Sequence, residues 1–354
     1  MTPPAQSEIA TPASSAASQL AALLQQTGLS RLDQLGWIRI TGEDRVRWLN
    51  GMVTNSIQDL LPSHGTYNFL LNVQGRILGD ATIFAQPDAF LMETASSQVP
   101  GMMTLLDRFI IMDDVTLTDI TSERSGLLVA GPQAASVLAK IGLSVDDLGT
   151  LEMRTASWNA SPISVFHMHS PLVPRFELWA IPEVTQKLAE ALHNAGAINC
   201  DLQSLEWLRI LEGTPLYGAD IRDRDLPQET GQTRALHFSK GCYLGQEIVE
   251  RIRSRGNVHR TFSAFRLKGN LPTAGTPLEA DGKQVGELTT VSAIPLSADD
   301  GNAIQLGLGY IRREALDRSA ALLYTGGAAV PVSLPFSAAA PSTRPPASES
   351  SERV

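Results

Sequence analysis

The residues with the clearest chemical potential lie in the octapeptide KGCYLGQE at positions 240–247. It contains Cys242, one of only two cysteines in the chain, and Lys240 stands two positions before it. Residues 248–253 combine good helix formers with helical apolar spacing, so we expect Cys242 to lie near a helix N-terminus. The partial positive charge at that end and the neighbouring lysine both favour a thiolate. The pattern predicts a reactive or ligand-donating thiol.

The other residues of the octapeptide shape the loop around this thiol. Two glycines let the backbone turn closely, and the polar residues at the end of the motif orient it; the set is Gly241, Tyr243, Gly245, Gln246 and Glu247. We expect Lys240 to activate the thiol or to pair with an anion. Five basic residues stand against two acidic ones between positions 240 and 260, which favours an anionic ligand. A solvated helix face with Glu and Arg four residues apart is the alternative.

Cys242 also has a plainer interpretation. Free cysteine is among the most buried residue types, so the thiol could be a small apolar group at a tight turn. A complete iron-sulfur site within the chain is a poor explanation, because such a cluster usually requires four cysteine ligands and only Cys200 and Cys242 are present. Cys200 has no basic neighbour, and we expect it to be structural.

Length and composition limit the classes of protein to consider. With 354 residues, two or three domains are expected. No apolar run approaches the ~18 residues that span a membrane, and the net charge of −9 argues against non-specific nucleic-acid binding. Two cysteines fit a reducing compartment, and residues 1–28 lack the arginines and lysines of a secretory or transit signal. We therefore expect a cytoplasmic protein without membrane or nucleic-acid partners.

The order of predicted elements indicates three modules. Two of them mix strands in hairpins with helices, which is typical of α+β layers, and the third has strands between Gly/Pro turns, which suits a small barrel. The first has strands at 37–41, 67–71, 81–84, 90–93 and 115–118 and helices at 42–49 and 102–109. The second has strands at 126–130, 163–166 and 176–179 and helices at 133–140 and 182–194. The third has strands at 262–267, 284–290 and 303–310.

Several motifs together carry a family resemblance. The octapeptide, continued through Gly256, Val258 and Arg260, resembles the signature of the YgfZ family of folate-binding proteins, which is linked to iron-sulfur cluster assembly or repair and is related to the aminomethyltransferase (T protein) of the glycine cleavage system. Further matching segments, in family order, are Leu49–Asn55, Leu71–Ile77, Val129–Pro132 and the spacing of Arg209, Gly213, Pro215, Gly218 and Asp220. The resemblance covers roughly residues 30–335, most of the foldable chain.

The resemblance implies a fold. It predicts the α+β architecture of the aminomethyltransferases: a three-domain ring of two α+β modules with antiparallel sheets and a C-terminal β-barrel. The corresponding boundaries are a disordered tail at 1–17, a first α+β domain at 18–124 that is completed by 203–258, a second at 125–202, the barrel at 259–336 and a second disordered tail at 337–354.

The resemblance also implies a cofactor, tetrahydrofolate or a one-carbon derivative. Pterin rings present an amide and amine edge that a buried carboxylate can bind, and the anionic glutamate tail suits arginines. We assign the binding residues as Asp80, Tyr67, Asn72, Arg253 and Arg260. The alternatives are a turn cap for Asp80 and a surface salt bridge for Arg253.

Two departures from the aminomethyltransferase pattern bear on activity. Gly79 stands where that pattern has an acid beside Asp80, and Leu211 stands where it has another, with Glu212 one position later. We therefore expect an accessory protein that binds folate and supports iron-sulfur assembly through Cys242 and Lys240, with folate and client iron-sulfur proteins or assembly factors as partners. The alternatives are a folate-dependent aminomethyltransferase or demethylase acting on a small amine, and a folate scaffold whose cysteine is structural.

Overall fold

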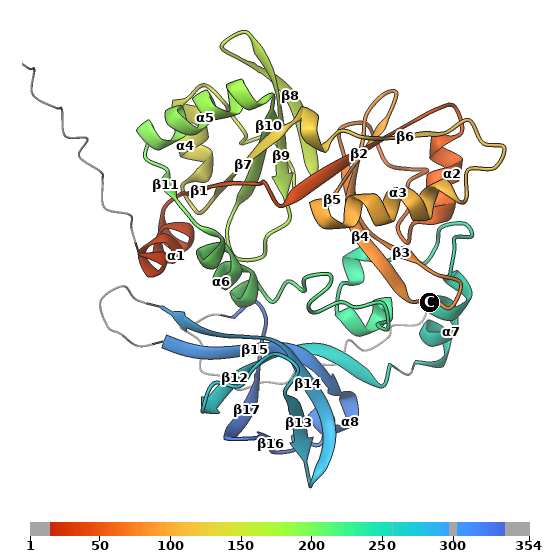
Figure 1. The fold of residues 1–354 in the computed structure, drawn as a ribbon, viewed down its shortest axis with the longest axis vertical. Coiled ribbons are helices and arrows are strands. Elements are labelled where there is room, and N and C mark those ends of the chain that lie inside the picture. The colour runs from red at the N-terminus through yellow and green to blue at the C-terminus, as the bar shows by residue number, and fades with distance from the viewer. Residues whose placement is uncertain (1–14, 257, 297–302, 337–354) are drawn as a thin grey trace, which may run out of the picture.

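Three bodies make up the protein. The computed structural model describes residues 15–256, 258–296 and 303–336. Two α+β units lie side by side above a β-barrel, as Figure 1 shows. The predicted α+β architecture with a C-terminal barrel is thereby confirmed. The tails predicted at 1–17 and 337–354 fall outside the described residues, except that Ser15 caps the first helix, which already begins at Ala16.

The first unit is built on an antiparallel sheet with strand order β3-β4-β5-β2-β6. Helices α2 and α3 bury apolar side chains such as Trp48, Leu49 and Met102 against it. The elements are β2 (Leu35–Thr41), α2 (Arg45–Met52), β3 (Gly65–Leu71), β4 (Ile77–Ala85), β5 (Phe90–Ala95), η1 (Ser96–Gln98), α3 (Val99–Asp107), β6 (Thr116–Asp119) and η2 (Thr121–Glu123). Every strand and helix predicted for this module is present, with ends that shift by a few residues.

The second unit has a sheet of order β11-β1-β7-β10-β9-β8, in which only the β1–β11 pair is parallel. Helices α4 and α5 cover one face. The elements are β1 (Gly28–Arg31), β7 (Ser125–Ala130), α4 (Ala134–Lys140), β8 (Glu152–Trp158), β9 (Ser161–Met168), β10 (Arg175–Ala180), α5 (Pro182–Asn194) and β11 (Ile198–Asn199). Strand β1 lies in the range assigned to the first domain from sequence, yet it pairs with β7 of the second. Strand β8 was also missed.

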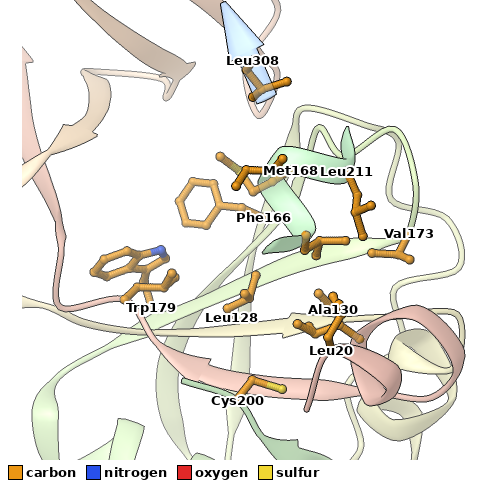
Figure 2. Close-up of a cluster of buried hydrophobic side chains, with 14 of the residues drawn as sticks. Leu20, Leu128, Ala130, Phe166, Met168, Val173, Trp179, Cys200, Leu211 and Leu308 are labelled. Carbon is orange, nitrogen blue, oxygen red and sulfur yellow. The ribbon is translucent and has the colours of Figure 1, made fainter. Parts of the chain in front are cut away.

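A large apolar cluster joins the three bodies. It includes side chains from α1 (Ala16–Gln25), both sheets, α6 (Leu202–Glu212) and the barrel. Figure 2 shows Leu20, Leu211 and Cys200 around Leu128 and Ala130, with Leu308 of the barrel at its upper limit. Cys200 is 7% exposed and belongs to this cluster. Burial raises the pKa of its thiol to about 11, which fits the structural role expected for it.

The barrel is closed, with strand order β12-β15-β14-β13-β16-β17. Its interior is filled by side chains such as Phe265, Leu278, Leu288 and Ile311, so it is a packed core. The elements are β12 (Arg260–Gly269), β13 (Pro277–Ala280), β14 (Lys283–Pro295), β15 (Ala303–Arg312), α8 (Arg313–Asp317), β16 (Leu322–Tyr324) and β17 (Gly327–Val332). The three predicted strands correspond to β12, β14 and β15.

The segment between α6 and the barrel is anchored by one buried carboxylate. Asp220 is fully buried and accepts hydrogen bonds from Arg209 Nη1 of α6 at 2.7 Å and from the Leu216 amide at 3.0 Å. Its other oxygen accepts from the Thr289 and Thr290 hydroxyls of β14 at 2.5 and 2.7 Å. One side chain thus holds a helix, a loop and a barrel strand together. The short helices η3 (Pro227–Thr230) and η4 (Thr233–Ala235) follow in the same segment.

Replacing Asp220 tests this anchor. We expect Asp220→Ala to lower the free energy of unfolding by about 3–5 kcal/mol, because the Leu216 amide, both threonine hydroxyls and Arg209 Nη1 lose their shared acceptor, while Arg209 loses one ion pair and keeps the one with Glu206. Urea unfolding measures the change. Asp223→Ala is the control, since Asp223 is exposed three residues away. Equal stability of the two variants would contradict the assigned role.

Candidate functional site

Two of the motifs found in the sequence meet at the ammonium group of Lys240. Its Nζ donates to the backbone carbonyls of Asn50, Val53 and Asn55 at 2.7, 2.7 and 2.5 Å. These carbonyls lie at and just beyond the C-terminus of α2, where helix carbonyls lack internal partners and negative partial charge gathers. Burial lowers the pKa of Lys240 to about 8, so the ammonium form still prevails at neutral pH. All three of its N–H groups bind the backbone, which leaves none for a folate anion.

Further backbone contacts seat the signature loop on the same motif. The Leu244 amide donates to the Gly51 carbonyl at 3.0 Å, and the His237 amide donates to the Thr54 carbonyl at 3.2 Å. The Thr54 hydroxyl in turn donates to the Ala235 carbonyl at 2.6 Å. The loop is therefore fixed along its length by the segment that ends α2.

The third motif contributes the β3–β4 turn. Asn72 Oδ1 accepts from the Gln74 and Arg76 amides at 3.0 and 2.9 Å, which makes Asn72 a turn residue. Gly245 adopts a left-handed conformation with φ +82°, and a Cβ there would lie 2.5 Å from the Asn72 carbonyl oxygen. The glycine is therefore required by this close approach. Asn72 was assigned to cofactor binding from sequence; in the structure it supports the loop.

Cys242 is exposed at the surface of this assembly. The predicted helix is present as α7 (Gln246–Arg255), and its N-cap is Gly245, so Cys242 lies four residues before the first helical residue. Gln246 Oε1 accepts from the Tyr243 amide at 3.2 Å, and Glu247 pairs with Arg251 on the exposed face at 2.8 Å. The thiol is thus accessible on a loop whose two ends are fixed.

The side chain of Tyr243 connects this loop to Asp80. Tyr243 belongs to an apolar cluster that also contains Tyr67, Phe69 and Val249. The Tyr67 hydroxyl donates to Asp80 Oδ2 at 2.6 Å, and Gln98 Nε2 donates to Asp80 Oδ1 at 3.0 Å. Burial raises the pKa of Asp80, while these two donors oppose the shift. The structure therefore joins Tyr67 to Asp80, a half-buried acid that two donors orient.

Two polar residues near Asp80 were not identified from the sequence as site residues. The Arg234 guanidinium lies over the Tyr67 ring at 4.2 Å and favours the charged forms of Asp80 and Glu212. Glu212 accepts a short hydrogen bond from the Ser170 hydroxyl, and burial raises its pKa. Arg234 stands in the short helix η4, which has too few residues for a recognisable spacing, so only the fold reveals it.

The structure explains both departures from the aminomethyltransferase pattern. A Cβ at Gly79 would lie 2.6 Å from Met102 Cε, so the space beside Asp80 is filled by α3. Leu211 is 2% exposed and lies in the core seen in Figure 2. Glu212, the next residue, interacts electrostatically with Arg234.

The two arginines assigned to folate lie elsewhere. Arg253 is on α7, half exposed, with its guanidinium over the Phe238 ring at 4.6 Å and Glu250 at 3.6 Å. Arg260 binds both oxygens of Glu229 at 2.9 and 2.8 Å and also binds Asp225 at 2.7 Å. These acids raise the pKa of Arg260. Arg260 therefore ties β12 to the preceding segment, and Arg253 occupies a surface position.

A second buried acid pair lies where the two sheets face each other. Glu93 of β5 is 5% exposed and contacts Glu177 of β10, which also binds Arg175 at 3.0 Å and the Trp179 indole at 3.1 Å. Burial, and then the charge and hydrogen bonding of Glu177, raise the pKa of Glu93 well above its ordinary value. Two carboxyl groups therefore lie close together in the interior between the two sheets, which disfavours the charged form of Glu93.

Comparison with known proteins matches two family models to this chain. Residues 8–240 match the GCVT N-terminal domain, and residues 260–340 match the CAF17 C-terminal beta-barrel domain. No group of His, Cys, Asp and Glu in the described ranges is arranged to hold a metal ion. No helix among them is long and apolar enough to cross a membrane.

Individual relatives agree with these models. An aminomethyltransferase of Nostoc sp. is 25% identical over 298 residues, which cover 77% of this chain and 75% of that protein. A chloroplastic protein of Arabidopsis thaliana is 25% identical over 287 residues, and the match spans 65% of its length and 80% of this chain. The solved aminomethyltransferase T of the glycine cleavage system from Bartonella henselae has a TM-score of 0.80 and 19% identity, covering 91% of this chain and 89% of that one. The fold is therefore shared over nearly the whole chain.

Replacing Lys240 tests its contacts with α2. We expect Lys240→Met to lower the free energy of unfolding by about 2–3 kcal/mol, because three carbonyls lose their donor. Hydrogen exchange should accelerate at the end of α2 and in residues 236–246 together. Lys187→Met, at an exposed position of α5, is the control. Unchanged exchange in both segments would contradict the contact.

The Glu93–Glu177 pair predicts a pH dependence. The unfolded chain holds Glu93 near its ordinary pKa of 4.5 and the folded protein holds it higher, so between these values the folded state binds more protons. Stability then falls as pH rises, by at most about 1.4 kcal/mol per pH unit. Glu93→Gln cannot titrate, so its stability relative to wild type should increase with pH above 4.5.

Urea unfolding at steps between about pH 5 and pH 7.5 measures this difference. Glu190→Gln is the control, because Glu190 is exposed on α5. A difference between Glu93→Gln and wild type that stays constant with pH would show that Glu93 does not titrate in this interval.

Proposed function

Because this chain belongs to the GCVT N-terminal domain family, we propose that it is a tetrahydrofolate-binding accessory protein of the YgfZ type, which supports assembly or repair of iron-sulfur clusters in client enzymes. The cofactor is tetrahydrofolate or a one-carbon derivative. Its relatives include aminomethyltransferases, and the CAF17 barrel matched at residues 260–340 favours the accessory type.

One observation carries the proposal: the loop with the exposed thiol and the half-buried acid Asp80 rest on the same apolar cluster. Tyr243 of the loop and Tyr67, which binds Asp80, both belong to it. A ligand held at Asp80 would therefore lie near the apolar cluster on which the Cys242 loop rests, although the thiol itself is exposed. This arrangement suits a protein that binds a small molecule inside and acts on another protein outside.

The exposed thiol is the group that would meet the client. Cys242 is exposed while Cys200 is buried in the core, so the two cysteines cannot act as a pair on one partner. A single thiolate supplies one of the four ligands that an iron-sulfur cluster usually needs. The cluster, as cargo, would take its other ligands from the client or from an assembly factor.

The second candidate is a folate-dependent aminomethyltransferase or demethylase that acts on a small amine. Asp80 favours it, because a half-buried acid held by two donors can orient an amine. The filled space beside Gly79 and the buried Leu211 count against it, since both positions lack the acid of the transferase pattern.

A titration with tetrahydrofolate, combined with a cellular assay, tests the proposal. We expect Asp80→Asn to weaken tetrahydrofolate binding by about tenfold, because a charged acceptor is lost. Cys242→Ala should bind folate as wild type does but fail to restore client iron-sulfur enzyme activity in cells that lack the protein. Ser239→Ala, at an exposed position in the same loop, is the control.

Three outcomes would overturn parts of this assignment. If the wild-type protein does not bind tetrahydrofolate, the proposed cofactor is wrong. If Cys242→Ala keeps full function in cells, the proposed role of the thiol is wrong. Release of formaldehyde or formation of methylenetetrahydrofolate from methylated amines, dependent on Asp80, would establish the transferase or demethylase instead.

A further inference from the structure

Arg234 differs from its neighbours in having no carboxylate partner. Four other arginines of the same region, namely Arg175, Arg209, Arg222 and Arg260, each have a carboxylate oxygen within 3.0 Å. Arg234 makes no ion pair with any residue in the described part of the chain; its Nε donates to the neutral amide of Gln232 at 3.1 Å. Burial lowers the pKa of Arg234, which means that its surroundings disfavour the charge.

The planar guanidinium of Arg234, whose two Nη atoms form a fork of donors, is nevertheless held in place. Its carbon lies 4.2 Å from the centre of the Tyr67 ring, and the contact with Gln232 fixes the other end of the group. Tyr67 is itself fixed by its hydrogen bond to Asp80. A planar cation stacked on an aromatic ring keeps its N–H groups directed along the ring face.

The two Nη atoms of Arg234 face accessible space. They make no hydrogen bond with the described residues, and neither is among the buried polar atoms that lack a partner. Asp80, Glu212 and His169 surround this space from β4, α6 and the segment after β9; each interacts electrostatically with Arg234 without bonding to it. Titratable groups from β4, α6 and the segment after β9 therefore lie near the two unbonded Nη atoms.

We propose that Arg234 is the receptor for a carboxylate of the bound small molecule. Two parallel N–H groups in a fixed plane match the two oxygens of a carboxylate, and a partly buried guanidinium that no carboxylate of the described residues bonds directly can still accept such a partner, while Asp80 and Glu212 act on it only at longer range. If the carboxylate belongs to folate, this proposal rests on the proposed function. If it belongs to a small amino acid, it does not require folate binding.

Two sources of the carboxylate have the same chemistry. One is the glutamate portion of the folate. The other is a small amino acid whose amine lies toward Asp80 or Glu212 while its carboxylate binds Arg234. Both would be held by the same fork, and removal of the carboxylate from either ligand should have the same effect as removal of the guanidinium.

The first experiment changes the ligand and leaves the protein intact. Wild-type protein is titrated with tetrahydrofolate and with its diamide, in which both glutamate carboxylates are converted to amides. N-methylglycine and dimethylamine form a second pair, with and without a carboxylate. If Arg234 binds the glutamate portion, the diamide should bind about 10- to 100-fold more weakly than tetrahydrofolate. If it binds an amino acid, only N-methylglycine should bind measurably.

The second experiment changes the protein. Arg234→Gln should abolish the difference within whichever pair shows one, because the ligand carboxylate then has no partner to lose. Arg234→Lys keeps the charge without the fork and should restore part of the difference. Arg154→Gln, which removes an exposed arginine of β8, is the control. Thermal unfolding of each variant shows whether the fold is kept.

The outcomes of the two experiments distinguish whether Arg234 binds a ligand carboxylate. A preserved difference in Arg234→Gln, or equal weakening of tetrahydrofolate and its diamide by that variant, would overturn the carboxylate role, because the guanidinium would then act elsewhere on the ligand. Wild-type protein that discriminates within neither pair would overturn it as well. Absence of binding by tetrahydrofolate and its diamide alike would instead count against the proposed function, and N-methylglycine would still test Arg234.

Discussion

The position of the candidate site depends on one ammonium group. Lys240 satisfies three carbonyls at the end of α2 and so joins the loop of residues 240–247 to the first sheet's helical layer. A point charge with three donors suits carbonyls that converge from different residues, whereas a planar arginine would not. Gly245 completes the attachment at the other end, where the loop passes against the β3–β4 turn. With both ends fixed, the exposed thiol has a defined place on the surface.

The fold was more predictable than the roles of individual residues. Alternating strands and periodic helices identified most elements, because both periods record which side chains face a core. The four residues of β1, Gly28–Arg31, were not predicted as a strand, and nothing in their sequence indicates that they pair with β7 of the second sheet. Short strands such as β11 carry too few residues for any period.

Two kinds of reasoning led to the candidate site residues. Local charge and helix position singled out Cys242, which is exposed in the structure, and the family resemblance supplied Tyr67 and Asp80, which are hydrogen-bonded across paired strands. Arg260 and Lys240 show the limit of that reasoning, since a basic residue beside an anionic ligand and one bound to buried acids or carbonyls look alike in sequence. Arg234 and Glu212 are brought together only by tertiary structure. Their partners lie on β3, β4 and the segment after β9, far from them along the chain.

The pairing of β1 with β7 and β11 has a consequence for how the chain can be divided. The second sheet takes its edge from residues 28–31 and 198–199, which enclose the entire first unit between them. A fragment cut at the apparent boundary of residues 125–202 would leave β7 with a bare row of backbone donors and acceptors, a surface prone to pair with other chains. The first sheet with its helices is therefore inserted as one continuous stretch between β1 and β7 of the second, so no contiguous segment of the chain contains the whole second sheet without the first.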